Sequence, residues 1–231
     1  GATTGFDWKL DRWVGRTDLR PEPVPTSLDY ERWLGPAPFK PYHPHRVHGS
    51  FRGYWDYDAG GLGDMGQHYL DPVQYLLDTD DESPVEITID APQQHPDAVG
   101  TWREIRMRYA DGCEIVLDGR SRDGDDKFID GPDGWVRKGL RSNVGNLRAM
   151  AARLPDPEPP VTDFHESVRT RRRFALDERR GHRSCTLVNL GAVALRLRRS
   201  LRFDPAKQRF RGDSDANRLL DPPGRAPWGL T

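Results

Sequence analysis

Apolar residues recur along the chain with two different periods, and each period predicts one kind of element. Residues 6–14 alternate aromatic or aliphatic side chains with charged ones, which predicts a half-buried strand. Further strands are predicted over 85–90, 104–109 and 114–118. Asp111-Gly112 supplies the hairpin turn between the last two, and residues 119–134 are expected to form more hairpin and loop.

Helical spacing governs other segments. Residues 66–77 and 184–199 carry apolar side chains at helix spacing, namely Tyr69, Val73, Leu76, Leu77 and Leu187, Leu190, Ala194, Leu197. Shorter helices are expected over 143–153 and 163–173, separated by a proline-rich breaker at 155–160. Because strands are followed by helices without βαβ alternation, the order predicts an α+β fold. We expect an open-faced, mainly antiparallel, mixed sheet with helices packed on one face.

An aromatic and proline-rich segment lies between the first predicted strand and the first helix. Pro21, Pro23 and Pro25 predict an extended linker, because each proline fixes φ and removes a backbone donor. Residues 28–60 show no regular period and are predicted to be a loop excursion from a single domain spanning 1–231. Aromatic side chains in such a loop either line a ligand pocket or an interface, or pin the loop to the core.

Composition and charge argue against a nucleic-acid-binding protein and against a membrane-spanning one. The 35 Lys and Arg nearly balance the 36 Asp and Glu, so bulk charge favours neither nucleic acid nor membrane as partner. Residues 164–212 are more basic, with a net charge of +10, and a solvated or intersubunit arginine face is favoured there over nucleic-acid binding. The longest mostly apolar stretch, 185–197, is interrupted by Asn189 and Arg196 and is too short to span a bilayer.

Two cysteines, Cys113 and Cys185, cannot form a disulfide framework, and no secretory signal is present in these residues. A reducing, cytoplasmic location is therefore expected, although a signal upstream would be invisible. His43, His45 and His48 alternate around Pro44, but no Cys or repeated carboxylate completes a zinc site nearby. We expect no metal site, and loop histidines facing a polar ligand are favoured.

Two motifs bear on chemistry. Gly61 to Gly66 spells the dinucleotide fingerprint GxGxxG, but no apolar strand precedes it, so we interpret the match as accidental. Asp64, His68 and Asp71 lie at i, i+4 and i+7 and share one face of a helix. A histidine beside carboxylates suits general acid–base chemistry. A capping aspartate with a core or surface histidine would give the same spacing, and spacing alone favours that simpler explanation.

Motifs spread over the whole chain resemble one known family. They are Trp33–Pro38, Pro41-Tyr42, the aromatic run to Tyr57, Gly63–Asp71, Phe164–Arg171, Gly181–Ser184, Phe203–Pro205, Gly212-Asp213, Ala216–Arg218 and Pro227-Trp228. In this order, over roughly residues 6–230, they resemble the C-terminal domain of the Gfo/Idh/MocA oxidoreductases.

The resemblance implies the substrate-binding and oligomerisation half of an NAD(P)-dependent oxidoreductase that acts on a CH–OH group of a sugar or cyclitol. It implies that His68 is the catalytic acid/base, that Asp64 orients the substrate, and that Asp71 supports the imidazole ring and contributes to substrate binding. The other predicted substrate contacts are Trp55, Tyr57, Arg52, Arg46 and His48.

The family's Rossmann fingerprint and its Glu-Lys-Pro lysine lie upstream, and nothing in this sequence corresponds to either. We therefore expect that the chain alone binds neither NAD nor NADP and needs a Rossmann domain, upstream or on a separate chain, for activity. A homo-oligomer through the sheet is expected, because an uncovered sheet face would leave an apolar patch. The alternative is a stand-alone carbohydrate-binding or oligomerisation module without catalysis.

Overall fold

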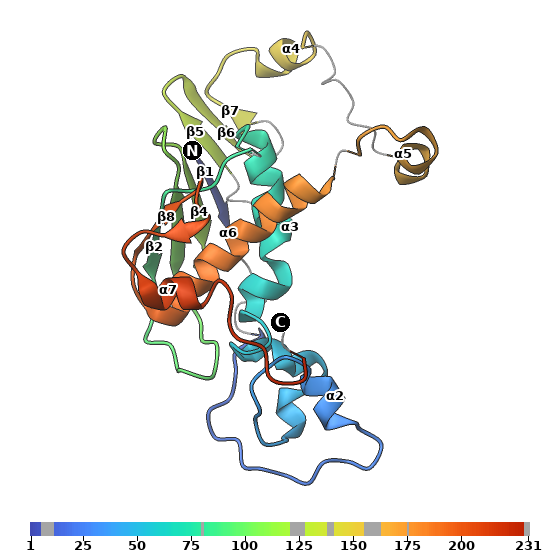
Figure 1. Cartoon of the computed structure of the whole chain (residues 1–231). Helices are drawn as coiled ribbons and strands as arrows, with labels where there is room; N and C mark the ends of the chain where they lie inside the picture. The colour runs from blue at the N-terminus through green and yellow to red at the C-terminus, as the bar shows by residue number, and fades with distance from the viewer. Residues whose placement is uncertain are drawn as a thin grey trace.

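The computed structural model describes residues 1–5, 12–79, 81–120, 128–137, 141–154, 163–174 and 176–228. A body of sheet and helices occupies the upper part of the molecule, and a smaller lobe that contains α2 (Tyr30–Leu34) lies at its lower end (Figure 1). Most of the strand predicted over 6–14 and the breaker predicted at 155–160 lie outside the described residues. The treatment of 1–231 as one domain stays a prediction.

Nine strands of the described residues form one sheet in the order β7-β6-β5-β1-β4-β3-β2-β8-β9. Their bounds are Ala2–Gly5 (β1), Glu86–Asp90 (β2), Glu104–Arg108 (β3), Glu114–Asp118 (β4), Phe128–Gly131 (β5), Gly134–Arg137 (β6), Arg141–Ser142 (β7), Leu201–Asp204 (β8) and Arg209–Phe210 (β9). Strand β1 is parallel to β4, and the other pairs are antiparallel. The predicted α+β class with an open, mixed, mostly antiparallel sheet is confirmed.

The three central strands and their turn also agree with prediction. Strands β2, β3 and β4 fall within two residues of the expected bounds, and Gly112 adopts φ +88° in the turn between β3 and β4. Pairing sets Ile105 opposite Leu117 and Met107 opposite Ile115, so one face of these strands is apolar.

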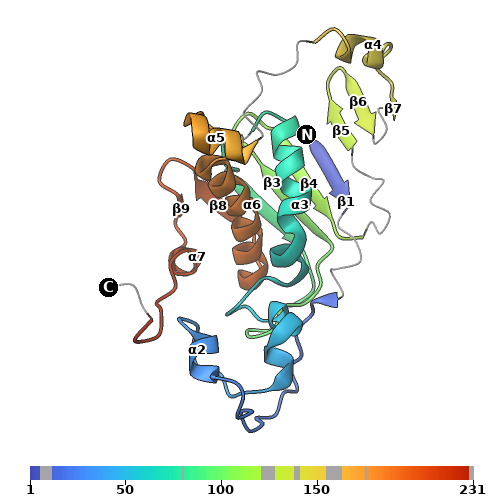
Figure 2. The same ribbon diagram turned by 90° about the vertical axis from the view of Figure 1, so that its right-hand side faces the viewer.

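Helices α3 and α6 cover that apolar face, as the view in Figure 2 shows. The helical elements are α2, the 3-10 turns η1 (Pro44–Arg46) and η2 (His48–Gly53), α3 (Gly60–Leu76), α4 (Leu147–Ala151), α5 (Phe164–Thr170), α6 (Glu178–Leu197) and α7 (Ser214–Arg218). The two long helices begin six residues earlier than predicted. Glycines hide the period at the start of α3, and the polar first turn of α6 follows an Asp177 cap that accepts the Arg180 N–H.

The core lies between the sheet and these two helices. Leu62 and Leu70 of α3 and Leu187 and Ala194 of α6 are buried against the sheet. The helices approach closely at Gly66, where a Cβ atom would lie 3.0 Å from Leu62 Cδ1 and 3.1 Å from Val188 Cγ2. Leu76, predicted on the apolar face, is instead 62% exposed at the last turn of α3.

The excursion over 28–60 has a small apolar core of its own. Tyr30, Leu34, Tyr42 and Val47 are buried together, and the Tyr30 ring lies 5.3 Å from the Tyr42 ring, edge on. Trp33 and Tyr57 pack against this cluster, so it accounts for four of the eight aromatic residues of the excursion without a ligand. The C-terminal segment braces the lobe, because the Arg225 N–H donates to Pro36 O at 2.9 Å (Figure 1).

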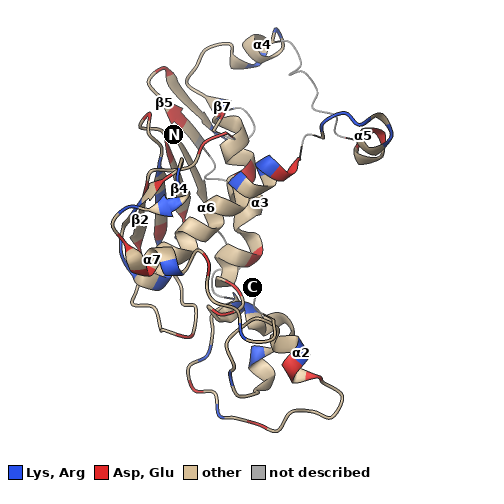
Figure 3. Ribbon diagram, in the orientation of Figure 1, with Lys and Arg blue, Asp and Glu red and all other residues tan. Residues whose placement is uncertain are grey.

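The face of the central strands that α3 and α6 leave uncovered carries charges. Arg106 on β3 pairs with Glu104 at 3.1 Å and with Glu114 on β4 at 2.7 Å, and Arg108 pairs with Glu86 on β2. Figure 3 shows these charges along the strands. The expectation of an apolar patch on this face is therefore wrong, because Arg and Glu alternate with the core residues along each strand.

Many arginines of the basic segment 164–212 also have acidic partners, for example Arg199 with Asp213 at 2.7 Å and Arg179 with Asp81 at 3.1 Å. Among the helices that the structure describes, none combines the length and the apolar character that a membrane crossing requires.

The tight contact at Gly66 gives a first prediction. Gly66→Leu should lower the free energy of unfolding by about 1–3 kcal/mol, because its side chain has to displace Val188 or separate α3 from α6. Gly181→Ala, also in a helix but with open space around its Cβ position, is the control and should raise stability by about 0.5–1 kcal/mol. Urea unfolding of both variants checks this, and an unchanged Gly66→Leu would show that the helices separate at no cost.

Candidate functional site

Helix α3 carries the predicted catalytic motif on the face that turns away from the core. His68 is exposed, and Asp71 is partly exposed three residues further along the helix. Asp64 lies inside α3 and not at its beginning, since the helix starts at Gly60. Asp64 therefore neither caps the helix nor sits in its first turn, and the capping explanation of the motif does not apply.

Two side chains from the segment before α3 hold the Asp64 carboxylate. Arg52 Nε–H donates to Asp64 Oδ1 at 2.6 Å, and Trp13 Nε1–H donates to Oδ2 at 2.9 Å. The Arg52 guanidinium also lies over the Trp13 ring, 5.0 Å from its centroid. With its side chain only 13% exposed and both oxygens engaged, Asp64 has a fixed orientation one helical turn before His68.

Asp58 lies just before α3, close to this ion pair. Its Oδ1 accepts the Ala59 N–H at 2.8 Å, and a Cβ atom on Gly63 would lie only 1.7 Å from that oxygen, so the carboxyl group requires glycine there. Burial raises the pKa of Asp58 to about 6, although the Ala59 N–H and the Arg52 charge favour the ionised form. The Asp64 charge raises this pKa further.

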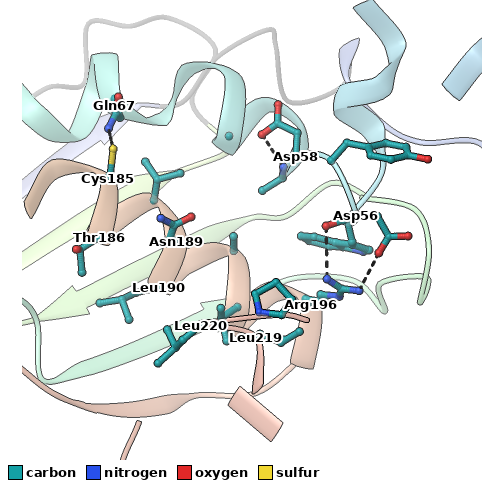
Figure 4. A pocket seen from close by; sticks show the side chains of 18 of the residues that line it. Asp56, Asp58, Gln67, Cys185, Thr186, Asn189, Leu190, Arg196, Leu219 and Leu220 are labelled. Atoms are coloured by element: carbon teal, nitrogen blue, oxygen red, sulfur yellow. Dashed lines mark hydrogen bonds and ion pairs between the residues drawn. The ribbon is translucent and has the colours of Figure 1, made fainter. Parts of the chain in front are cut away.

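A cavity of about 740 Å³ opens on the other side of α3, towards α6 (Figure 4). Its walls come from residues 55–59 of the lobe, from Gly63 and Gln67 of α3, from α6, and from the C-terminal segment at 219–222. Trp55 and Tyr57, two of the predicted substrate contacts, line this cavity, whereas Asp64, His68 and Asp71 do not. The motif and the cavity thus lie on two adjacent sides of α3, and Trp55 and Tyr57 reach the cavity from the lobe.

The remaining predicted contacts lie elsewhere in the lobe. Arg46 is buried and pairs with Asp97 at 2.6 Å, and its guanidinium stacks over the Tyr54 ring. Lys40 joins the same cluster, 2.9 Å from Asp97. His48 is exposed, with a left-handed backbone at φ +55°. The structure brings Arg52 to the motif on α3, but among the described residues no hydrogen bond or ion pair joins Arg46 or His48 to it.

The other histidines of the lobe make local contacts. His43 Nδ1 accepts the His45 N–H at 2.9 Å, and His45 Nδ1 lies 2.7 Å from the Tyr54 hydroxyl. Burial lowers the pKa of His45. Across the part of the chain that the structure describes, no group of three or more His, Cys, Asp or Glu side chains is placed to hold a metal ion.

The GxGxxG match lies within the first two turns of α3. A dinucleotide fingerprint needs these glycines in a turn between a strand and a helix, where backbone N–H groups face the pyrophosphate. Here the glycines serve packing, at Gly63 for Asp58 and at Gly66 for Val188. The described residues therefore form no phosphate loop at this motif.

Two contributors to these surfaces were missed by the sequence analysis. Trp13 contacts Asp64 across 51 positions of sequence, and no local pattern signals such a contact. Asp58 lies two residues before Gly60, and a carboxylate at the entry to a glycine run is a signal in the sequence that indicates such a residue.

Comparison with known proteins identifies one family whose model matches the chain. A family model described as the C-terminal alpha/beta domain of an oxidoreductase family, Gfo/Idh/MocA, matches residues 1–230. A search of curated proteins finds no match to the chain.

The buried Asp58 gives a prediction on pH. Its pKa is about 6 in the folded protein against 3.8 for an ordinary aspartate, so between these values the folded state binds more protons than the unfolded chain. Stability contributed by Asp58 is therefore lost as the pH rises from about 4 to about 6. Asp58→Asn should remove this loss and be more stable than the wild type at neutral pH.

Urea unfolding between about pH 4 and pH 8 measures the effect. Asp133→Asn, which removes the same charge from an exposed hairpin turn, is the control. A difference between the wild type and Asp58→Asn that stays constant over this range would contradict the assignment.

Proposed function

The chain belongs to the Gfo/Idh/MocA oxidoreductase family as its C-terminal alpha/beta domain, and we propose that it is the substrate-binding and acid/base half of an NAD(P)-dependent enzyme acting on a CH–OH group of a sugar or cyclitol. The observation that carries the proposal is an exposed imidazole, His68, one helical turn from a carboxylate, Asp64, that two donors hold in place.

The side chains on this face have separate roles in the proposed reaction. His68 takes the proton from the substrate hydroxyl as the carbon is oxidised, and returns it in the reverse direction. Asp64 cannot rotate freely, because Arg52 and Trp13 hold both of its oxygens, so it presents a fixed negative charge beside the bound substrate. Asp71, partly exposed, offers acceptor oxygens to further hydroxyl groups.

The other proposed substrate contacts differ in how close they lie to the motif on α3. Arg52 lies beside the motif and can donate to the substrate through the amino groups that do not bind Asp64. Trp55 and Tyr57 are reached only by a substrate that extends into the cavity between α3 and α6. Arg46 and His48 stay predictions, because no hydrogen bond or ion pair within the described residues links them to the motif.

The nicotinamide cofactor is proposed to come with a Rossmann domain, either upstream in the same protein or on a separate chain. Gly61 to Gly66 are helical and packed, so the residues present do not fit the pyrophosphate of a dinucleotide. NAD or NADP would accept the hydride in the complete enzyme, and we expect the chain alone to bind neither and to be inactive.

Replacing the imidazole tests the proposed acid/base. In the enzyme completed by its Rossmann domain, His68→Ala should lower kcat by about 10²–10⁴-fold, because proton transfer at the substrate oxygen is lost. His165→Ala, an exposed histidine on α5, is the control and should leave the rate unchanged. Steady-state kinetics with a panel of sugars and cyclitols measures both variants.

An unchanged rate for His68→Ala would remove the catalytic assignment. If no Rossmann domain yields activity, yet the chain binds a carbohydrate and His68→Ala weakens that binding by less than about tenfold, the stand-alone binding module is the better description.

A homo-oligomer through the sheet is the second part of the proposal. An interface on the ion-paired face would exchange contacts such as Arg106–Glu114 for pairs between subunits. Association at tens of micromolar should therefore be present in dilute buffer and weaken at about 1 M salt, where the screening length falls to about 3 Å. Sedimentation measures this, with Arg106→Glu as the disrupting variant, and a monomer at low salt would contradict it.

A further inference from the structure

The cavity between α3 and α6 has a size and a lining that suit a small ligand. Its volume of about 740 Å³ lies within the range of small-molecule sites, about 300–1,000 Å³. Val193 of α6 and Leu219 and Leu220 of the C-terminal segment supply an apolar wall. Figure 4 shows Asp58 on the lobe side and Asn189 on α6, with Leu219 and Leu220 opposite Asp58.

Two polar side chains of the cavity have unused hydrogen-bonding capacity within the described structure. Asp58 uses one oxygen for the Ala59 N–H, and no described residue donates to the other. Asn189 is exposed on α6, and its amide makes no hydrogen bond with any residue that the structure describes. A ligand that reaches both walls would therefore meet an acceptor and an amide that are free to bind it.

The charges around the cavity decide the class of ligand. Asp56 already faces two cations, Arg196 at 3.5 Å and Lys40 at 3.5 Å. Arg52 is the cation whose charge favours ionised Asp58, but its guanidinium already binds Asp64. The negative charge of Asp64 opposes ionisation of Asp58. Asp58 is thus a half-buried carboxyl whose charge the protein does not balance with a partner of its own.

We propose that this cavity binds a small organic amine, with its ammonium group on Asp58 and its apolar body against Val193, Leu219 and Leu220. An ammonium donates to the free oxygen of Asp58 and supplies the charge that the site lacks. An anion beside Asp58 would meet an unbalanced carboxylate, and Arg196, the arginine of the cavity lining, is already paired with Asp56. Asp58 faces the cavity and His68 does not, so this inference does not depend on the proposed dehydrogenase activity, and a substrate that reached Trp55 and Tyr57 would share the cavity with the amine.

Three probes of equal shape and different charge test the class: benzylamine, benzyl alcohol and benzoate. Calorimetric titration of the full chain at about pH 8, where the Asp58 carboxyl is ionised, should give a dissociation constant of about 0.1–1 mM for benzylamine. Benzyl alcohol should bind at least tenfold more weakly, and benzoate should show no binding. Equal affinity for the amine and the alcohol would overturn the assignment of a cation.

Two variants of the cavity lining test whether benzylamine binds at Asp58 inside this cavity. Asp58→Asn keeps the shape of the side chain and should weaken benzylamine binding by about tenfold or more. Asn189→Trp, at an exposed position on the cavity wall, should block binding by filling the space while leaving Asp58 in place. Asp133→Asn controls for net charge and should bind benzylamine like the wild type. Failure of benzylamine to bind the wild type, or unchanged binding in both cavity variants, would overturn the proposal whatever the outcome for His68.

Discussion

The close packing of α3 between α6 and the sheet is the constraint on which the rest of the structure depends. Leu62, Gly66 and Leu70 recur every fourth residue on one side of the helix, where the two leucines enter the core and Gly66 lets Val188 of α6 approach. With this side committed to packing, the 3.6-residue period places Asp64 and His68 on the opposite, outward side. The polar motif is thus presented by the same contacts that hold the helices together.

This constraint also explains why a sequence that matches the dinucleotide-binding fingerprint serves helix packing in this protein. Gly63 and Gly66 have no side chain that would separate α3 from its neighbours, so close packing accounts for two of the three glycines of the fingerprint match. Because α3 is already helical at these residues, their N–H groups serve the helix and do not converge on an anion. The same letters therefore indicate packing when no strand precedes them.

Several features were readable from the sequence because they depend on neighbours along the chain. The period of two predicts β2, β3 and β4, and Gly112 predicts their turn, since both are local properties. The parallel pairing of β1 with β4 joins residues over a hundred positions apart, and no local pattern specifies it. The start of α3 was missed because packing glycines carry no hydropathy signal.

The candidate site also combines features that neighbouring residues determine with contacts between residues far apart in the sequence. The spacing of Asp64 and His68 predicts a shared helix face, which the structure has. The hydrogen bonds from Trp13 and Arg52 to Asp64 depend on how the chain folds between the lobe and α3. The spacing of residues within α3 does not predict them. The charged face of the sheet, in contrast, is a local property, because Glu104 and Arg106 alternate with core residues along β3.

Asp58, which precedes α3, and Asp64, which lies inside it, differ in how far the protein balances the charge of the carboxylate. Asp64 has a guanidinium and an indole N–H on its oxygens, so its charge is balanced and its position fixed. Asp58 has a single backbone donor and a raised pKa, so its charge is balanced only when something else supplies a cation or a proton. A compensated carboxylate can orient a neighbour without needing a ligand, whereas an uncompensated one gains from binding one. Asp58, five residues before Gly63, and Asp64, one residue after it, therefore suit different tasks on adjacent sides of α3.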